Sequence, residues 1–340
     1  MSLYNVDFLY CKYFQLIEMK KISVLIARIL VSATFLYSGF VKLVDPIGSE
    51  YKFTEYFGAD VLNLEFLIPF ALPFSIFLIL TEIMLGLALL IGYKRKITVW
   101  SLFGMTLLFL FLTWYSAYYN KVTDCGCFGD ALKLSTWETF YKNVVLIVFI
   151  LLLLFQQEAI RPLFKERALK AIVFSSVLAF SYIVYHVLVH LPLMDFRAYA
   201  VGKNIQEGMA YVDGSEDLPP VHDFFLESET EDLTDQILSA EKAMLLIAYD
   251  IEKSNWVGFT AFQRILQQAK EMGYLVYGVS AAPEEELRAL QKEMKLPVDF
   301  LFCDETTLKT MIRANPGLIA LERGTVVGKW NWRDADTVFD

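Results

Sequence analysis

The chain has few of the side chains that bind metal ions. Its 340 residues include only 4 cysteines and 3 histidines, and about four nitrogen or sulfur ligands at a recognisable spacing would be needed for a structural zinc site. The sequence therefore predicts no structural zinc site. Clusters of lysine and arginine are also missing, and acidic residues outnumber basic ones by 39 to 30. Because phosphate binding needs clustered cations, nucleic acid is excluded as a partner.

Apolar residues, in contrast, are abundant. They make up 56% of the chain, which includes 28 phenylalanines, and this composition is typical of a membrane protein rather than a soluble enzyme. They are concentrated before Met194, whereas residues 196–340 carry 25 acidic and 14 basic side chains. The sequence thus predicts a membrane region followed by an acidic soluble region.

Five apolar stretches are long enough to cross a membrane, which takes roughly 20 residues of helix. No cleavable signal peptide is expected, because the first stretch is long, lacks a small-residue cleavage site and is followed by more spans. Met19 resembles a natural start, so residues 1–18 are interpreted as an extension, and the start codon stays open between Met1 and Met19. The loop after the first span is long enough for an extra interfacial helix. The expected spans are 22–44, 66–91, 97–118, 137–155 and 169–191.

Lysines and arginines in short loops indicate the orientation, because cationic loops stay cytoplasmic. The N-terminus and the second and fourth loops carry ten: Lys12, Lys20, Lys21, Lys94, Arg95, Lys96, Arg161, Lys165, Arg167 and Lys170. The first and third loops carry four: Lys42, Lys52, Lys121 and Lys133. We therefore expect a cytoplasmic N-terminus and, after five spans, a periplasmic soluble region. The third loop then faces the oxidising side of the membrane, where disulfides persist.

The soluble region shows alternating strand and helix patterns. A connector over residues 195–241 precedes a strand at 242–251, a helix at 259–272 and a strand at 274–281. A helix over 284–294 follows Pro283 and has three glutamates in its first turn, where the helix dipole favours anions. A strand at 298–304, a short helix at 305–314 and a hairpin that turns at Arg323 and Gly324 complete the pattern.

This order and the stretch "RANPGLIAL" resemble the thioredoxin-like family over about residues 242–332. The resemblance implies that Pro316 is cis, which is essentially a proline property. Thioredoxins carry Cys-x-x-Cys after the first core strand, but the aligned positions here are approximately Ser254 and Val257. The domain is therefore expected to bind substrate through Pro316, Ser254 and Trp256 without performing dithiol exchange. Cys303 is interpreted as a buried small hydrophobe.

Two other cysteines, Cys125 and Cys127, lie one residue apart between the third and fourth spans. Gly126 tolerates unusual backbone angles, so the pair can close a very small disulfide ring. Such a ring is strained, and strained, exposed disulfides have the higher reduction potentials of labile or catalytic pairs. The residues alone leave four interpretations open: an electron relay, a structural staple, a metal site with other ligands, and an inert pair.

Three stretches of the membrane region carry a second resemblance: "LYSGFVKLVDP", "TEIMLGLALLIG", and "DCGCFGD" followed by "WETFYKN". Over roughly residues 22–155 they resemble the DoxX and MauE-type family of four-helix membrane proteins. MauE-type proteins are associated with methylamine utilisation, through maturation of a disulfide-rich enzyme subunit. The resemblance favours the relay interpretation, with electrons passing from substrate thiols into the membrane.

Ionisable residues within the spans are further candidates, because charges are costly there and often functional. Glu82 in the second span is either such a group or the partner of a neighbouring hydroxyl. Lys142 and Asn143, one turn into the fourth span, can stabilise a thiolate or a quinone oxygen, although snorkelling also explains Lys142. The hydroxyls considered for Glu82 are those of Thr81, Thr113 and Ser116.

His186 and His190 share a face of the fifth span, because they are four residues apart. That spacing allows haem or metal binding, but it also fits ordinary interfacial packing, and no second such pair exists in the sequence.

The expected fold is a four-helix membrane core plus a fifth span, followed by a thioredoxin-like α/β domain. The expected function is thiol–disulfide redox or disulfide maturation in the bacterial inner membrane. The alternatives are a non-enzymatic assembly scaffold and a small-molecule transporter centred on Glu82. Expected partners are periplasmic protein thiols or disulfides and membrane lipids, and a quinone near Asn143 is the candidate cofactor. The catalytic candidates are Cys125, Cys127, Glu82 and Lys142. The domain boundaries are 1–21, 22–155, 156–194, 195–241 and 242–340.

Overall fold

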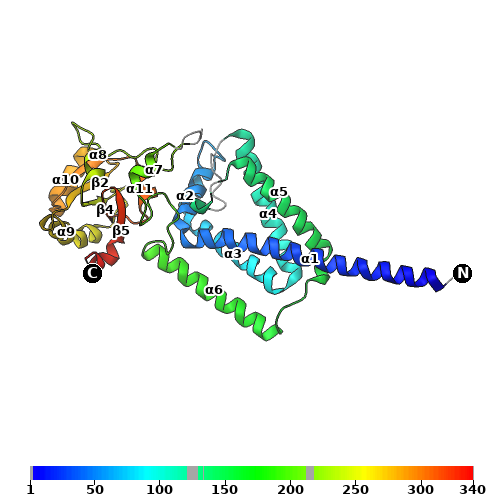
Figure 1. Ribbon diagram of the computed structural model, residues 1–340. Helices are drawn as coiled ribbons and strands as arrows, with labels where there is room; N and C mark the ends of the chain where they lie inside the picture. Colours follow the sequence, from blue (N-terminus) through cyan, green and yellow to red (C-terminus); the bar gives the residue numbers. More distant parts are fainter. Residues whose placement is uncertain (1–2, 121–128, 133, 212–217, 340) are drawn as a thin grey trace. The chain divides into compact units, whose positions relative to one another are not determined.

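The computed structural model describes residues 3–120, 129–132, 134–211 and 218–339, with side chains of the first helix described from Glu18 onward. The chain divides into two compact units, Met1–Tyr185 and His186–Asp340. The first consists of helices, and the second contains the sheet (Figure 1).

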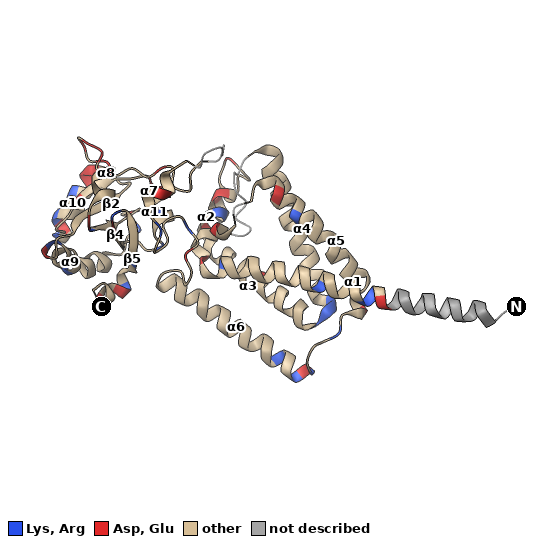
Figure 2. Cartoon of the chain, viewed as in Figure 1, with Lys and Arg blue, Asp and Glu red and all other residues tan. Residues whose placement is uncertain are grey.

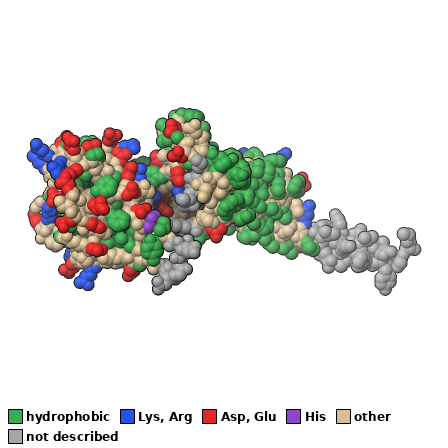
Figure 3. Space-filling view, turned by 90° about the horizontal axis from the view of Figure 1, so that it is seen from above, with side chains coloured by type: hydrophobic (Ala, Val, Ile, Leu, Met, Phe, Trp, Pro, Cys, Tyr) green, Lys and Arg blue, Asp and Glu red, His purple; other side chains and the backbone are tan. Residues whose placement is uncertain are grey.

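Within the described residues, five helices are long and apolar enough to span a membrane, as expected. They run over Glu18–Val44, Glu65–Ile91, Arg95–Tyr119, Thr136–Phe155 and Glu166–Val189. Along their length these helices are largely uncharged (Figure 2), and hydrophobic side chains cover most of their visible face (Figure 3). The elements of the membrane region are α1 (Leu3–Val44), α2 (Pro46–Phe57), η1 (Glu65–Phe70), α3 (Ala71–Ile91), α4 (Arg95–Tyr119), η2 (Gly129–Ala131), α5 (Thr136–Phe155), η3 (Gln157–Ala159) and α6 (Glu166–Val189).

Helices α1 and α3 approach each other closely, because glycine faces the partner helix from both sides. A Cβ built on Gly39 of α1 would lie 2.8 Å from Cβ of Ile83, and one built on Gly86 of α3 would lie 3.0 Å from the backbone nitrogen of Leu36. Small residues at such contacts let backbones pack tightly in membrane proteins. Side chains of α1 and α3 near these glycines can therefore contact each other directly.

Arginines donate hydrogen bonds to backbone carbonyls in the loops that the sequence predicts to be cytoplasmic. Arg28 of α1, 7% exposed, donates to the carbonyl oxygens of Leu89 and Leu90 at the end of α3 and to that of Arg161. The Leu89 carbonyl also accepts a hydrogen bond from the Gly92 backbone nitrogen. A cation at this helix end opposes the negative end of the α3 dipole. Arg95 donates in the same way to the carbonyl of Glu158.

The second unit contains a five-stranded sheet in the order β3-β2-β1-β4-β5. Strands β1, β2 and β3 are parallel, whereas β4 is antiparallel to both β1 and β5. Every side chain of β1 is buried, as its continuous apolar run predicts. The elements are α7 (Ile205–Met209), α8 (Thr234–Ser239), β1 (Ala243–Ile247), α9 (Trp256–Glu271), β2 (Leu275–Ser280), α10 (Glu284–Met294), β3 (Asp299–Phe302), α11 (Glu305–Met311), β4 (Gly317–Glu322), β5 (Thr325–Asn331) and η4 (Trp332–Thr337).

Helix α9 covers one face of this sheet and the segment before β1 covers part of the other. Phe259 and Phe262 of α9 are fully buried on the first face. Ile205, Phe224 and Leu226 are fully buried on the second. The segment expected as a linker over 195–241 thus supplies core side chains to the second unit. The sequence did not indicate this burial, because the apolar residues of the segment are spaced among acids and prolines and do not form one long run.

Candidate functional site

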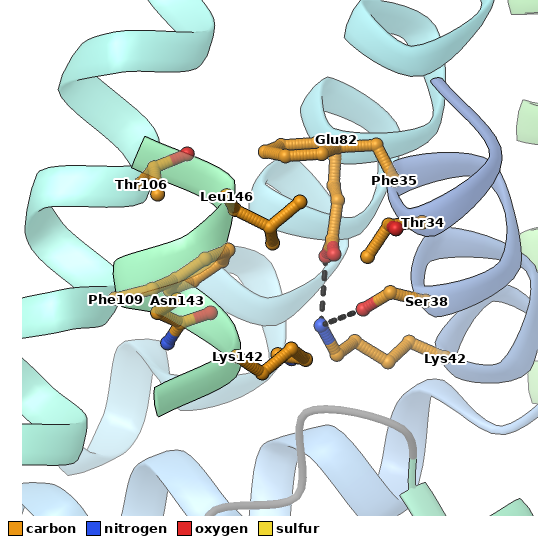
Figure 4. A pocket seen from close by; sticks show the side chains of 10 residues that line it. All are labelled: Thr34, Phe35, Ser38, Lys42, Glu82, Thr106, Phe109, Lys142, Asn143 and Leu146. Atoms are coloured by element: carbon orange, nitrogen blue, oxygen red, sulfur yellow. Dashed lines mark hydrogen bonds and ion pairs between the residues drawn. The ribbon is translucent and has the colours of Figure 1, made fainter. Parts of the chain in front are cut away.

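Four helices bring polar side chains together inside the membrane bundle (Figure 4). Lys42 comes from α1, Glu82 from α3, Thr106 from α4 and Asn143 from α5, and all four are buried. Buried polar groups in a membrane helix need partners, so their grouping marks this place as the candidate site.

An ion pair occupies the centre of the site. Nζ of Lys42 lies 2.8 Å from Oε2 of Glu82, and the two side chains are 8% and 3% exposed. Lys42 also donates to Oγ of Ser38 at 3.1 Å, and its ammonium lies 5.3 Å from the centre of the Phe109 ring. Because both charges have left water, removing one would leave the other buried without compensation.

The local sequence explains how the pair forms. Ser38 and Lys42 are four residues apart and therefore share one face of α1. Glu82 lies on α3, four residues before Gly86, and Gly39 follows Ser38. The close approach of α1 and α3 at these glycines brings the carboxylate to the ammonium without a long reach by either side chain.

This arrangement changes two sequence-based interpretations. Lys42 was counted among the loop cations, but it lies in α1 and points into the bundle, because its apolar neighbours continue the helix to Val44. The expected hydroxyl partners of Glu82 bond elsewhere: Thr81 to the carbonyl of Phe77, Thr113 to that of Phe109, and Ser116 to Tyr56. The partner of Glu82 is Lys42, which sequence reasoning missed. Its place four residues after Ser38 in an apolar helix was the available signal.

The ion pair lies in a pocket whose other walls include two of the predicted residues. Lys142 and Asn143 both line it, together with Thr34, Phe35, Ser38, Thr106, Phe109 and Leu146. The structure thus brings Glu82, Lys142 and Asn143 together around one pocket. Asn143 donates to Oγ1 of Thr113 at 3.3 Å.

A second, more apolar pocket adjoins the first. The two share Lys42 and Phe109. Its remaining walls are Ser49, Lys52, Phe53, Tyr56, Leu78, Ile79, Leu112 and Thr113. Lys42 therefore contributes to the walls of both pockets.

The two membrane-loop cysteines, Cys125 and Cys127, lie outside the described residues. The residues that follow them are described. A Cβ built on Gly129 would lie 3.1 Å from Cγ1 of Val41, the neighbour of Lys42 in α1. Four residues beyond the short η2 turn, Ser135 caps α5. Gly129 therefore packs against α1 at the residue next to Lys42.

The second unit has a separate polar cluster around the predicted proline. The Asn315–Pro316 bond is cis, as expected. Oγ of Ser254 donates to Oδ1 of Asn315 at 2.9 Å, and the Asn255 backbone nitrogen donates to the carbonyl of Asn315 at 3.1 Å. Asn255 caps α9, which begins at Trp256, and this tryptophan is 46% exposed. The three predicted residues Ser254, Trp256 and Pro316 thus lie around one helix end.

Cys303 and the histidines do not add to either site. Burial raises the pKa of the Cys303 thiol to about 12, so it is not a nucleophile at neutral pH. The rings of His186 and His190 pack at a tilt with centroids 4.7 Å apart, and Nδ1 of His190 lies 2.6 Å from Oδ1 of Asp334. Within the described part of the chain, no group of three or more His, Cys, Asp or Glu residues could hold a metal ion.

These features define a membrane protein with a buried ion-pair pocket in a helical bundle and a soluble mixed α/β domain. Residues 20–156 match the family model described as methylamine utilisation protein MauE. The match covers the helices that form the pocket and the segment with the paired cysteines, and it supports the MauE-like membrane family for this region. No curated protein matches the chain.

Proposed function

We propose that this protein carries out thiol–disulfide exchange at the membrane, with Cys125 and Cys127 as the reacting pair. The observation that carries the proposal is the Cys-Gly-Cys sequence within the region that matches MauE. Support comes from the polar pocket in the same bundle, whose α1 wall lies beside Gly129, two residues after Cys127.

The proposed chemistry is a two-electron exchange. A dithiol of a partner protein reduces the Cys125–Cys127 disulfide and becomes a disulfide itself. The pair is then reoxidised: its two thiols lose two protons and two electrons to an acceptor in the membrane, and the disulfide bond forms again. The strain of so small a ring raises its reduction potential, which suits a pair that oxidises others. Glu82 and Lys142 supply charged groups along the route by which we propose that electrons pass from the cysteines into the membrane.

We further propose that the soluble domain has a thioredoxin-like fold and binds the partner protein without exchanging thiols. Parallel β1 and β2 joined by α9, and the cis-Pro316 loop against the start of α9, support this assignment. Exposed Trp256 beside Ser254 and Pro316 offers an apolar contact for the partner. No cysteine stands at this helix end, where Asn255 is the capping residue.

The proposed location is the bacterial inner membrane, with the N-terminus in the cytoplasm and residues 196–340 in the periplasm. Because Lys42 lies in the bundle and not in a loop, the outer loops carry one cation fewer than the sequence suggested. The excess of lysine and arginine in the loops assigned to the cytoplasm is therefore larger. Alkaline phosphatase fused after the C-terminal residue should be active, because this enzyme needs the oxidising periplasm. An inactive fusion that is nonetheless expressed would contradict the orientation.

Alkylation trapping in native membranes tests the redox proposal. Membranes are quenched with a mass-tagged maleimide before and after a pulse of mild reductant, and the chain is followed by its shift in mobility. We expect two interconverting species that are absent from the Cys125→Ser, Cys127→Ser double variant. Cys303→Ser is the matched control, and it should leave both species in place.

Permanent oxidation under mild reductant would contradict the proposal. The pair would then be a structural staple, and a membrane assembly scaffold would be the better description.

A further inference from the structure

We propose that the loop over residues 193–196 of the second unit lies in the headgroup region of the lipid bilayer and keeps the start of α9 close to the membrane surface. The membrane contact stands on the structure of the second unit alone. Its use, which is to hold the partner-binding residues at the membrane, rests on the proposed function.

The end of α6 marks where the hydrocarbon core of the membrane ends. This helix has 24 residues, so it is about 36 Å long, slightly more than the roughly 30 Å core of a bilayer. Tyr182 and Tyr185 in its last turns are both exposed, and tyrosines are enriched at the boundary between lipid and water. The residues that directly follow Val189 therefore begin in the headgroup region.

The same helix end is attached to the soluble domain. The second unit begins at His186, so the last turn of α6 belongs to it. Asn331 at the end of β5 donates to the His190 carbonyl at 3.3 Å, and Arg333 donates to the Val189 carbonyl at 3.2 Å. These contacts hold β5 and η4 at the point where the chain leaves the membrane.

Beside this attachment the chain exposes apolar side chains and turns its acid inward. Residues 187–202 contain one acid, Asp195, and its carboxylate is paired with Arg197 at 2.7 Å and with Lys329 of β5 at 2.8 Å. Neighbouring exposed apolar residues mark an interaction surface. The exposed side chains of this stretch are all apolar: Leu193, Met194, Phe196 and Val201.

Two anchor points on β5 make the segment a loop. Asn331 binds His190 and Lys329 binds Asp195, and these two strand positions are about 7 Å apart. Chain from residue 190 to residue 195 could span roughly 17 Å if it were extended, so the segment between the anchors has slack and loops outward. Met194 lies in this loop and is 51% exposed.

The bilayer is the occupant that this position favours. The loop follows Val189 within a few residues, at the edge of the hydrocarbon core, where lipid already surrounds the end of the span. Apolar side chains at this boundary leave water by entering the zone between headgroups and acyl chains. A protein partner would first have to displace that lipid.

The attachment to α6 also positions the start of α9. A Cβ built on Gly258, in the first turn of α9, would lie 2.8 Å from Cγ of both Pro316 and Trp332. The guanidinium carbon of Arg333 lies 4.1 Å from the centre of the Trp332 ring, and Arg333 binds the Val189 carbonyl. Two side chains thus connect the cis-proline and α9 to the end of the span, whereas the far end of this 16-residue helix is about 24 Å away.

Spin-label accessibility in the full chain tests the membrane contact. A nitroxide is attached to Met194→Cys or to the matched control Met272→Cys, a methionine that follows α9 and is 48% exposed. The chain is placed in phosphatidylcholine nanodiscs, and power saturation compares collisions with oxygen, which dissolves in lipid, and with a nickel chelate, which stays in water. We expect the ratio of oxygen to nickel accessibility to be several-fold higher for the Met194→Cys label. Both variants also carry Cys11→Ser, Cys125→Ser and Cys127→Ser, and this triple variant alone gives the background from Cys303.

Equal ratios at the two positions would overturn the membrane contact, since the loop would then lie in water. Low accessibility of the Met194→Cys label to both reagents would also overturn it, because a protein surface would then cover the loop. Both labels replace exposed side chains, and an unchanged far-UV circular dichroism spectrum checks that the variants are folded.

Energy transfer to a lipid dye tests the position of α9. A donor dye is attached to Val257→Cys, which is exposed in the first turn of α9, or to Met272→Cys at the far end. With rhodamine-labelled phosphatidylethanolamine in the nanodisc, transfer should be more efficient from Val257→Cys. Equal or lower efficiency from this position would refute the placement of α9.

These measurements do not depend on the redox proposal, because the variants lack Cys125 and Cys127. If the wild-type thiols cycle but the loop lies in water, this inference fails alone. If the loop lies in lipid but the thiols do not cycle, the redox proposal fails alone.

Discussion

Removing one charge of the Lys42–Glu82 pair should destabilise the membrane bundle far more than removing both. The charges lie 2.8 Å apart with side chains 8% and 3% exposed, so neither has water to replace its partner. Glu82→Gln and Lys42→Met should each lower the free energy of unfolding by about 3–5 kcal/mol, whereas the double variant should lose much less. The coupling energy of the double-mutant cycle should therefore be about 3 kcal/mol or more.

Titration of the full chain from dodecylmaltoside into SDS, followed by far-UV circular dichroism, measures this effect, because most helical residues lie in the membrane region. The matched control is the pair Lys52 and Glu55 in α2, which is 3.1 Å apart but 31% and 40% exposed. Breaking that pair should cost about 0–1 kcal/mol. Single variants of the buried pair within about 0.5 kcal/mol of wild type, or costs that simply add in the double variant, would refute the reasoning.

Three further predictions concern groups outside the pocket. Arg28→Lys should lower the unfolding free energy of the same bundle by about 2 kcal/mol, because an ammonium cannot reproduce the forked contact with three carbonyls; an unchanged SDS midpoint would contradict this. Cys303 should resist maleimide at pH 8 in the folded chain and react after denaturation, since burial raises its pKa to about 12; rapid labelling of the native protein would count against its burial. Burial, with Arg197 nearby, lowers the pKa of Lys329 from 10.5 to about 8. The unfolded chain therefore holds that proton up to higher pH, and the soluble domain should gain at most about 1.4 kcal/mol of stability per pH unit from pH 8 toward 10. Pulse proteolysis in urea should show this gain in wild type, and an equal gain in Lys329→Met would contradict it.

Local sequence was sufficient to predict most elements, because long apolar runs and strand–helix alternation leave few alternatives. The helix over Glu284–Met294 begins directly after Pro283, as the three glutamates of its first turn indicated. The hairpin turns at Arg323 and Gly324, both with positive φ. Each of these signals depends only on residues close together in the chain.

Long-range pairing was beyond the same reasoning. Lys42 looked like a loop cation, because it lies at the end of an apolar stretch, just before Asp45 and Pro46. Its partner Glu82 is forty residues away. The contact depends on how closely α1 and α3 approach at Gly39 and Gly86. Likewise, the burial of Phe224 could not be read from an acid- and proline-containing stretch, because the sheet face that covers it is formed by residues farther along the chain.

The capped start of α5 limits how a chemical change in the preceding loop can affect this helix. Ser135 accepts a hydrogen bond from the Glu138 backbone nitrogen, and the Glu138 carboxylate accepts one from the Ser135 backbone nitrogen. These two reciprocal hydrogen bonds form a capping box, so the first turn of α5 is stabilised by residues 135–138 themselves. Making or breaking a bond between Cys125 and Cys127 therefore need not rotate or unwind the helix that carries Asn143. Any signal from the thiols to the buried ion pair would then travel as charge or through a bound molecule, with the first turn of α5 left in place.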